Sequence, residues 1–80
     1  MKVRLFGLFR EVVGSKEILL HFNDVDVTVS ALKRGFFDVC PDLVSLGVLF
    51  VVAVNRKVVG DTAKVTPTDE VALLPLVSGG

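Results

Sequence analysis

The sequence has one cysteine, one histidine, no tryptophan or tyrosine, and no net charge. A single cysteine excludes a disulfide within the chain and agrees with a reducing compartment. The nine basic and nine acidic residues are scattered, without a basic run or an RNA-binding motif, so nucleic-acid binding is not expected. No apolar run approaches the ~20 residues of a membrane helix, and the first residues lack the apolar core of a signal peptide. We therefore expect a cytoplasmic protein that contacts neither nucleic acid nor membrane.

Side chains that commonly perform catalysis or bind metals are also scarce. His21 has no second ligand or acid at a useful spacing. Cys40 has no neighbouring cation or histidine to lower its thiol pKa, so a role as a small buried apolar residue is expected. The sequence thus predicts no catalytic residue, no metal and no bound cofactor, and a free-standing enzyme is the least expected class.

Apolar residues, in contrast, are abundant, at 51% of an 80-residue chain. A chain of this length forms one small domain, predicted over residues 1–80, and buries only about 60% of its unfolded surface. Some apolar surface should therefore remain exposed as a patch for a partner. The alternative interpretation is simply a well-filled core.

Periodicity and turn residues predict an α+β domain. Residues 48–54 are the most apolar run and are expected to form a central strand covered on both faces. Residues 9–14 are expected to be a connection with at most one helical turn, and residues 42–47 a loop. One helix, capped by Thr28, should cross a mixed sheet of four or five strands. The expected elements are strands over 2–9, 16–22, 48–54, 57–59 and 70–74, and a helix over 29–38.

Two alternation patterns assign faces to these elements. In the first strand, Val3 and Leu5 share one side, while Arg4 and the aromatic Phe6 lie on the side expected to face solvent. In the helix, a stripe at helical spacing should pack on the sheet, and Gly35 costs about 1 kcal/mol relative to alanine. The residues of that stripe are Val29, Leu32 and Phe36.

The C-terminus is the stretch with the clearest functional pattern. Pro75 lacks an amide donor and should end the last strand, leaving residues 76–80 as a flexible tail. Those five residues span roughly 16 Å when extended, enough to enter another protein's active site. Gly79 and Gly80 have no Cβ, and the α-carboxylate is the only reactive group at the tip. The alternative is a frayed terminus without function.

Four segments, in this order, resemble the MoaD/ThiS ubiquitin-like family, and within it the small sulfur-carrier subunits of molybdopterin synthase (MoaD type). They are LFGLFREVVG (5–14), TVSAL (28–32), AVNRKVV (53–59) and DEVALLPLVSGG (69–80). The resemblance implies a ubiquitin-like β-grasp fold. Two positions depart from the family pattern: Gly7 stands where alanine is common, and Leu76 where a second proline is common. Leu76 leaves the tail less stiff than a Pro-Pro ending would.

The resemblance also implies a sulfur-transfer reaction at Gly80. An E1-like adenylyltransferase would use ATP to adenylate the Gly80 carboxylate, and sulfur from a desulfurase would convert it to a thiocarboxylate. The tail, Val77-Ser78-Gly79-Gly80, would then enter the large catalytic subunit of molybdopterin synthase, in a heterotetramer, and give sulfur to a pterin precursor. The resemblance places the docking interface at Phe6, Val58, Leu74 and Pro75.

Other functions remain open at this stage. A ubiquitin-like protein ending in Gly-Gly can be joined to lysines of target proteins, and related carriers supply sulfur for thiamine or tRNA thiolation. A plain interaction module with a functionless tail is a third alternative. The choice between molybdenum and tungsten, and the oligomeric state of the isolated chain, also stay open.

Overall fold

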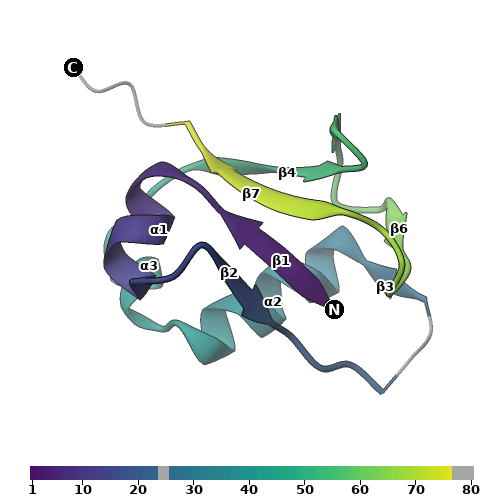
Figure 1. Cartoon of the computed structure of the whole chain (residues 1–80), viewed down its shortest axis with the longest axis horizontal. Helices are drawn as coiled ribbons and strands as arrows, with labels where there is room; N and C mark the ends of the chain where they lie inside the picture. Colours follow the sequence, from purple (N-terminus) through teal and green to yellow (C-terminus); the bar gives the residue numbers. More distant parts are fainter. Residues whose placement is uncertain (24–25, 77–80) are drawn as a thin grey trace.

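The computed structural model describes residues 1–23 and 26–76. Five strands form a mixed sheet in the order β2-β1-β7-β4-β5, and two short strands, β3 and β6, form a second sheet. The helix α2 crosses one face of the larger sheet (Figure 1), which confirms the predicted α+β class and the mixed five-stranded sheet. The elements are β1 (Lys2–Leu5), α1 (Gly7–Val13), β2 (Glu17–Leu19), β3 (Val27–Thr28), α2 (Val29–Val39), α3 (Asp42–Ser45), β4 (Phe50–Val54), β5 (Lys57–Val59), β6 (Lys64–Val65) and β7 (Val71–Pro75).

The strand β7 lies in the middle of the larger sheet. It pairs in parallel with β1, where Val3 stands opposite Val71, and antiparallel with β4, where Val52 stands opposite Leu73. β1 also pairs antiparallel with β2, and β4 with β5, as expected for neighbouring segments joined by short connections. The first and last strands of the chain are therefore neighbours in space.

The sheet has one buried face, which packs against α2. Alternation along β1 confirms the prediction: Val3 and Leu5 are buried, whereas Lys2 and Arg4 are exposed. The predicted helical stripe is confirmed as well, because all three of its members are fully buried. The inner layer consists of Val3, Leu5, Val52, Val71 and Leu73 from the sheet and Val29, Leu32 and Phe36 from α2.

The ends and interior of α2 follow from local chemistry. The Thr28 hydroxyl accepts a hydrogen bond from the amide of Ala31 at 3.2 Å, as predicted for an N-cap. A Cβ on Gly35 would lie 3.1 Å from the ring of Phe22. Gly35 thus lets the segment after β2 approach the helix closely, which accounts for a glycine at a position where it weakens the helix.

Several predicted boundaries are wrong. The first strand ends at Leu5, not residue 9, because Gly7 adopts a left-handed φ of +54° and begins α1. The second strand covers only Glu17–Leu19, and Asp42–Ser45 is the short helix α3 instead of a loop. In α1, Phe9 turns inward and its ring meets those of Phe36 and Phe50 edge-on, with centroids 5.5 and 5.1 Å apart.

The prediction for residues 48–54 is also corrected. The strand β4 covers Phe50–Val54 and lies between β7 and β5, so it is not the central strand. Only its inner side is covered by the helix, and its outer side borders an open groove that includes Ala53. The apolar run in β4 therefore has two causes: one face of the strand is buried in the core, and the other face contributes to an apolar surface.

Candidate functional site

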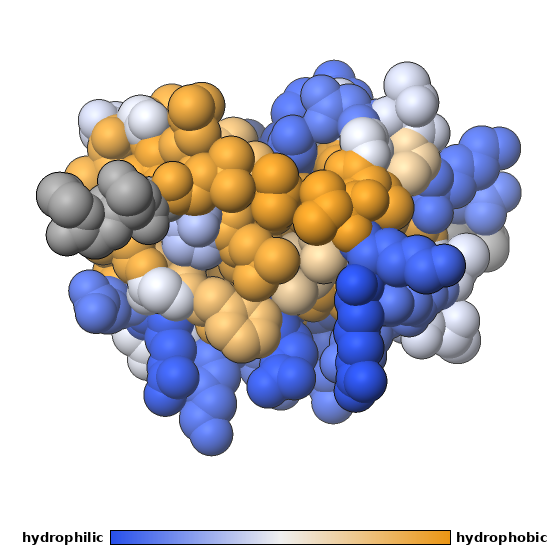
Figure 2. All heavy atoms as spheres, turned by 90° about the horizontal axis from the view of Figure 1, so that it is seen from above, coloured by the Kyte–Doolittle hydropathy of each residue, from blue (hydrophilic) through white to orange (hydrophobic). Residues whose placement is uncertain are grey.

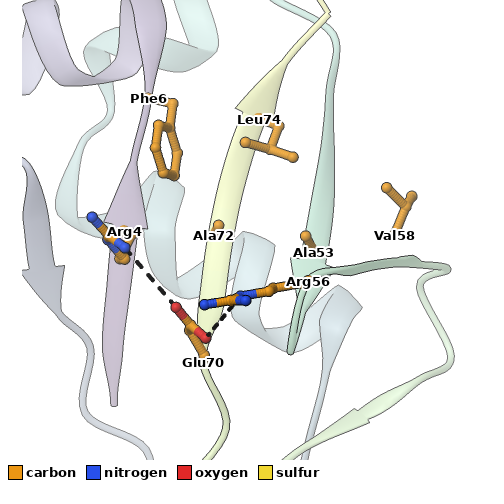
Figure 3. Close-up of a pocket in the computed structure, with 8 residues that line it drawn as sticks. All are labelled: Arg4, Phe6, Ala53, Arg56, Val58, Glu70, Ala72 and Leu74. Atoms are coloured by element: carbon orange, nitrogen blue, oxygen red, sulfur yellow. Dashed lines mark ion pairs between the residues drawn. The ribbon is translucent and has the colours of Figure 1, made fainter.

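An open groove crosses the outer face of the sheet, opposite α2 (Figure 3). Its volume is about 290 Å³, at the small end of the range for ligand pockets, and it is partly open to solvent. These dimensions suit the side chains of a docking protein better than an enclosed small molecule. The groove is lined by Arg4, Phe6, Ala53, Arg56, Val58, Glu70, Ala72 and Leu74.

Strand register accounts for the groove. A single cross-strand row joins Arg4 on β1 to Ala72 on β7, Ala53 on β4 and Val58 on β5. Side chains in one such row project from the same face of a sheet. The two alanines occupy the middle of the row, and their small side chains leave the hollow between larger neighbours.

The structure brings together three of the four residues predicted for the interface. Phe6 keeps an extended backbone, with φ −130° and ψ 160°, so it continues the outward direction of β1 before α1 begins. It is 39% exposed and Val58 is 64% exposed, while Leu74 lies half-buried between them. Figure 2 looks onto this face and shows apolar side chains forming a continuous area across it, with hydrophilic side chains at its edges.

The fourth predicted residue, Pro75, lies outside the groove and packs at the end of β7. A Cβ on Gly7 would lie 3.2 Å from Cγ of Pro75, so Gly7 permits a close contact between α1 and β7. Beyond it, the amide of Leu76 donates to the carbonyl of Leu49 at 2.8 Å. The path of the chain is thus fixed through Leu76. The predicted tail residues Val77 to Gly80 lie outside the described residues.

Charged residues occupy the end of the groove where β7 begins. Glu70 lies between two arginines, with a carboxylate oxygen 3.9 Å from Arg4 Nη1 and the other 3.9 Å from Arg56 Nε. The Arg4 guanidinium also lies 5.6 Å from the centre of the Phe6 ring. Alternation had placed Arg4 on this face, but no sequence signal indicated that Arg56 and Glu70 would join it.

The turn between β4 and β5 positions this charged group. Asn55 and Arg56 both have positive φ, 52° and 69°, which produces a tight hairpin. The Asn55 amide nitrogen donates to the Glu70 carbonyl at 2.7 Å, and the Asn55 side-chain oxygen accepts from the Glu70 amide at 3.0 Å. The Asn55 side chain also donates to Asp69 at 3.0 Å. The Thr66 amide and Asn55 hydrogen bonds lower the pKa of Asp69 below its ordinary value of 3.8.

The other candidate residues do not form a second site. Burial, and secondarily the charge of Asp42, raises the pKa of the Cys40 thiol, which makes it a poor nucleophile at neutral pH. His21 is exposed beyond β2. Within residues 1–23 and 26–76, no cluster of three histidine, cysteine or acidic residues could bind a metal. In the same part of the chain, no helix is both long and apolar enough to cross a membrane.

Comparison with known proteins assigns this chain to a family. The model of the ThiS family matches residues 3–80. The chain belongs to the ThiS family. It is thus a small ubiquitin-like protein of the ThiS/MoaD sulfur-carrier type, a type that is not itself catalytic. The predicted β-grasp fold and the family resemblance are both confirmed.

Individual relatives agree with this assignment. The molybdopterin synthase sulfur carrier subunit of Dictyostelium discoideum is 30% identical over 81 aligned positions, covering 99% of this chain and 94% of the relative. The crystal structure of SAMP1 from Haloferax volcanii superposes with a TM-score of 0.84 at 28% identity, covering all of this chain and 98% of the other. A second crystal structure, of H. volcanii small archaeal modifier protein 1, gives a TM-score of 0.82 at 28% identity, with coverage of 96% and 97%.

Proposed function

We propose that this chain is the sulfur-carrier subunit of a molybdopterin synthase. One observation carries the proposal: Phe6, Val58 and Leu74 share an apolar groove on the sheet, and β7 leads from that groove directly towards the C-terminal Gly-Gly. A docked partner would therefore receive the C-terminus next to its contact surface. The full-length likeness to a molybdopterin synthase sulfur carrier subunit supports the same assignment.

The proposed chemistry takes place at the Gly80 carboxylate. A carboxylate is a weak electrophile, so an E1-like adenylyltransferase first joins it to the AMP portion of ATP and releases pyrophosphate. A sulfide-level sulfur atom, supplied through a desulfurase, then attacks the acyl carbon and displaces AMP, leaving a thiocarboxylate. This sulfur is ionised at neutral pH and is a capable nucleophile towards a pterin precursor. Gly79 and Gly80 leave the acyl carbon unobstructed.

In this proposal the chain supplies docking and the reacting group, and its partners supply the rest of the machinery. The large synthase subunit would cover the groove and receive Val77 to Gly80 in its active site. Two carriers and two large subunits would form a heterotetramer in the cytoplasm. The carrier binds no cofactor, since ATP is used by the activating enzyme.

The intact mass of the protein isolated from its native cell tests the proposal. We expect a species heavier by the mass difference between sulfur and oxygen, located on Gly80 by fragmentation. The same species should form in vitro with the activating enzyme, ATP and sulfide. A chain lacking Gly79 and Gly80 is the control, and should dock but remain unmodified. Free acid alone under all of these conditions would contradict the carrier function.

A protein modifier is the second candidate, and the structural likeness to a small archaeal modifier protein supports it. Activation would begin with the same adenylate, but a lysine amine would displace AMP to give an isopeptide. Deletion of the gene separates the two functions. Accumulated pterin precursor supports the synthase function, and loss of Gly80-linked lysine adducts supports the modifier.

A further inference from the structure

The two ends of the groove differ in chemistry. Phe6 and Leu74 lie towards the end where β7 runs to Pro75, while the arginines and Glu70 lie where β7 begins (Figure 3). Glu70 and Pro75 are five positions apart along the extended chain, a distance of about 17 Å. A docking partner therefore meets an apolar surface near the C-terminal segment and charged groups far from it.

Among the residues that line the groove, the charged end carries two arginines and one carboxylate. Arg4 and Arg56 share one carboxylate, that of Glu70, and both ion pairs are 3.9 Å long. At this separation neither pair is a close hydrogen bond, and the side chain of Arg56 is 89% exposed. Exposed pairs of this kind are weak, so both guanidinium groups keep donors available to another acceptor.

We propose that the partner places a carboxylate side chain between Arg4 and Arg56, while apolar side chains of the same segment cover the alanine floor of the groove. This inference rests on the proposed function and specifies the chemistry of the partner: an acidic residue beside an apolar ridge. The contact would add a second acceptor to two guanidinium groups that now share one. It would also balance the two arginines of the groove lining with two carboxylates, Glu70 and that of the partner.

Charge complementarity favours this partner over a second copy of the chain. In a two-fold dimer through the groove, an axis near the charged end would bring four arginines together with only the two Glu70 carboxylates. An axis near the middle would press those arginines against the apolar end of the other copy. Both arrangements desolvate charge without a matching counter-charge, which is costly. A partner carboxylate removes this cost.

A charge at one end also fixes the direction of docking. An apolar groove alone accepts a ridge in either direction along its length. A carboxylate that must meet the arginines permits only one direction, the one that keeps the partner's remaining surface on the side of Pro75 and the C-terminal segment. Electrostatic contacts of this kind act chiefly on register and association rate.

The experiment measures the dissociation constant between the full chain and its cognate large synthase subunit by calorimetry, at low and at physiological salt. Arg4→Gln with Arg56→Gln should weaken binding about tenfold at low salt and reduce the salt dependence. Arg34→Gln with Lys64→Gln is the matched control, because it removes the same charge from exposed positions on α2 and β6. The control should bind as the wild type does.

A third variant should change the affinity in the opposite direction. Glu70→Gln keeps the size of the side chain and the backbone hydrogen bonds to Asn55 but removes the carboxylate that already occupies the arginines. Binding should become tighter at low salt, by about threefold if the released contact is worth a fraction of a kcal/mol. A merely structural role of Glu70 would weaken binding instead.

The outcomes separate the two proposals. Unchanged affinity in the double arginine variant, or an equal loss in the control, would overturn the partner carboxylate while leaving the synthase function intact. Absence of any wild-type complex would overturn the synthase function, and the partner named here with it. Thiocarboxylate formation on Gly80 is measured separately by mass, so a defect in activation is not mistaken for a defect in docking.

Discussion

Two structural features require a glycine at position 7. Its φ of +54° starts α1 directly after β1, and its missing side chain makes room for Pro75. The first feature concerns the backbone conformation, while the second concerns packing against the strand that leads to the C-terminal segment. Gly14, at the other end of α1, has φ of +80°, but a Cβ there would meet nothing within 4 Å among the described residues. The pair therefore separates the two effects.

Gly14→Ala should lower the free energy of unfolding by about 1 kcal/mol, the cost of a left-handed conformation for a residue with a Cβ. Gly7→Ala should lower it by about 2–3 kcal/mol, because the new methyl group also crowds Pro75. Urea unfolding measures both values. An equal loss of unfolding free energy in the two variants would mean that Pro75, at the end of β7, moves away from the added methyl group at no cost.

Asp69 makes stability depend on acid pH. Hydrogen bonds from Thr66 and Asn55 lower its pKa in the folded chain, so the unfolded chain takes up a proton first as pH falls. The contribution of Asp69 is complete above the ordinary aspartate pKa of 3.8 and is lost progressively as pH drops from there through the folded-state pKa. Asp69→Asn should therefore lower stability at neutral pH and flatten this part of the profile. Parallel acid profiles of variant and wild type would contradict the assignment.

At the scale of elements, the start of α1 places two aromatic residues, Phe6 and Phe9, on opposite sides of the sheet. Phe9 is 1% exposed and meets two other rings in the core, whereas Phe6 precedes the helix on the outer face. Phe9→Ala should cost about 3–5 kcal/mol, a large share of the stability of a domain this small. Phe6→Ala should cost less than about 1.5 kcal/mol. Thermal unfolding of the two variants gives the comparison, and a similar loss for both would contradict this placement.

The elements also show how far the sequence alone leads. The helix α2 was predictable because a hydroxyl cap precedes an apolar stripe at helical spacing. α1 was not, because its first residue is a glycine, its cap position is Phe6 without a side-chain hydrogen bond, and Leu8 and Phe9 prolong the apolar pattern of β1. The strands β3 and β6 have two residues each, too few for a periodic signal.

The groove was predictable in part for a similar reason. Alternation along β1 placed Arg4 and Phe6 on the outer face, because charged and apolar residues alternate there. Around Val58 and Leu74 the neighbours are apolar as well, so alternation alone could not assign a face, and the family resemblance named them instead. The meeting of Arg56 with Glu70 depends on the Asn55 turn, which joins segments 14 residues apart.

For the whole molecule, the central expectation concerns docking without loss of folding. Leu74→Arg places a charge in the apolar half of the groove, on a face that the helix does not cover. The variant should keep its circular dichroism spectrum and melt within a few degrees of the wild type, but bind the large subunit at least tenfold more weakly. Val39→Arg, at an exposed apolar position on α2, is the control and should bind normally. If Leu74→Arg bound the large subunit as tightly as Val39→Arg, the proposed interface would be wrong.

The parallel pairing of β1 with β7 has a further consequence, for how the protein is made. Among the described elements, the middle strand β7 is the last to be synthesised, and its partner β1 is the first. Contacts between residues such as Val3 and Val71 close a loop of about 70 residues, and such loops form late and slowly. Until β7 emerges, the nascent chain holds an unfilled gap between β1 and β4. A message cut short before Val71 should therefore yield a polypeptide that never folds and is open to proteolysis.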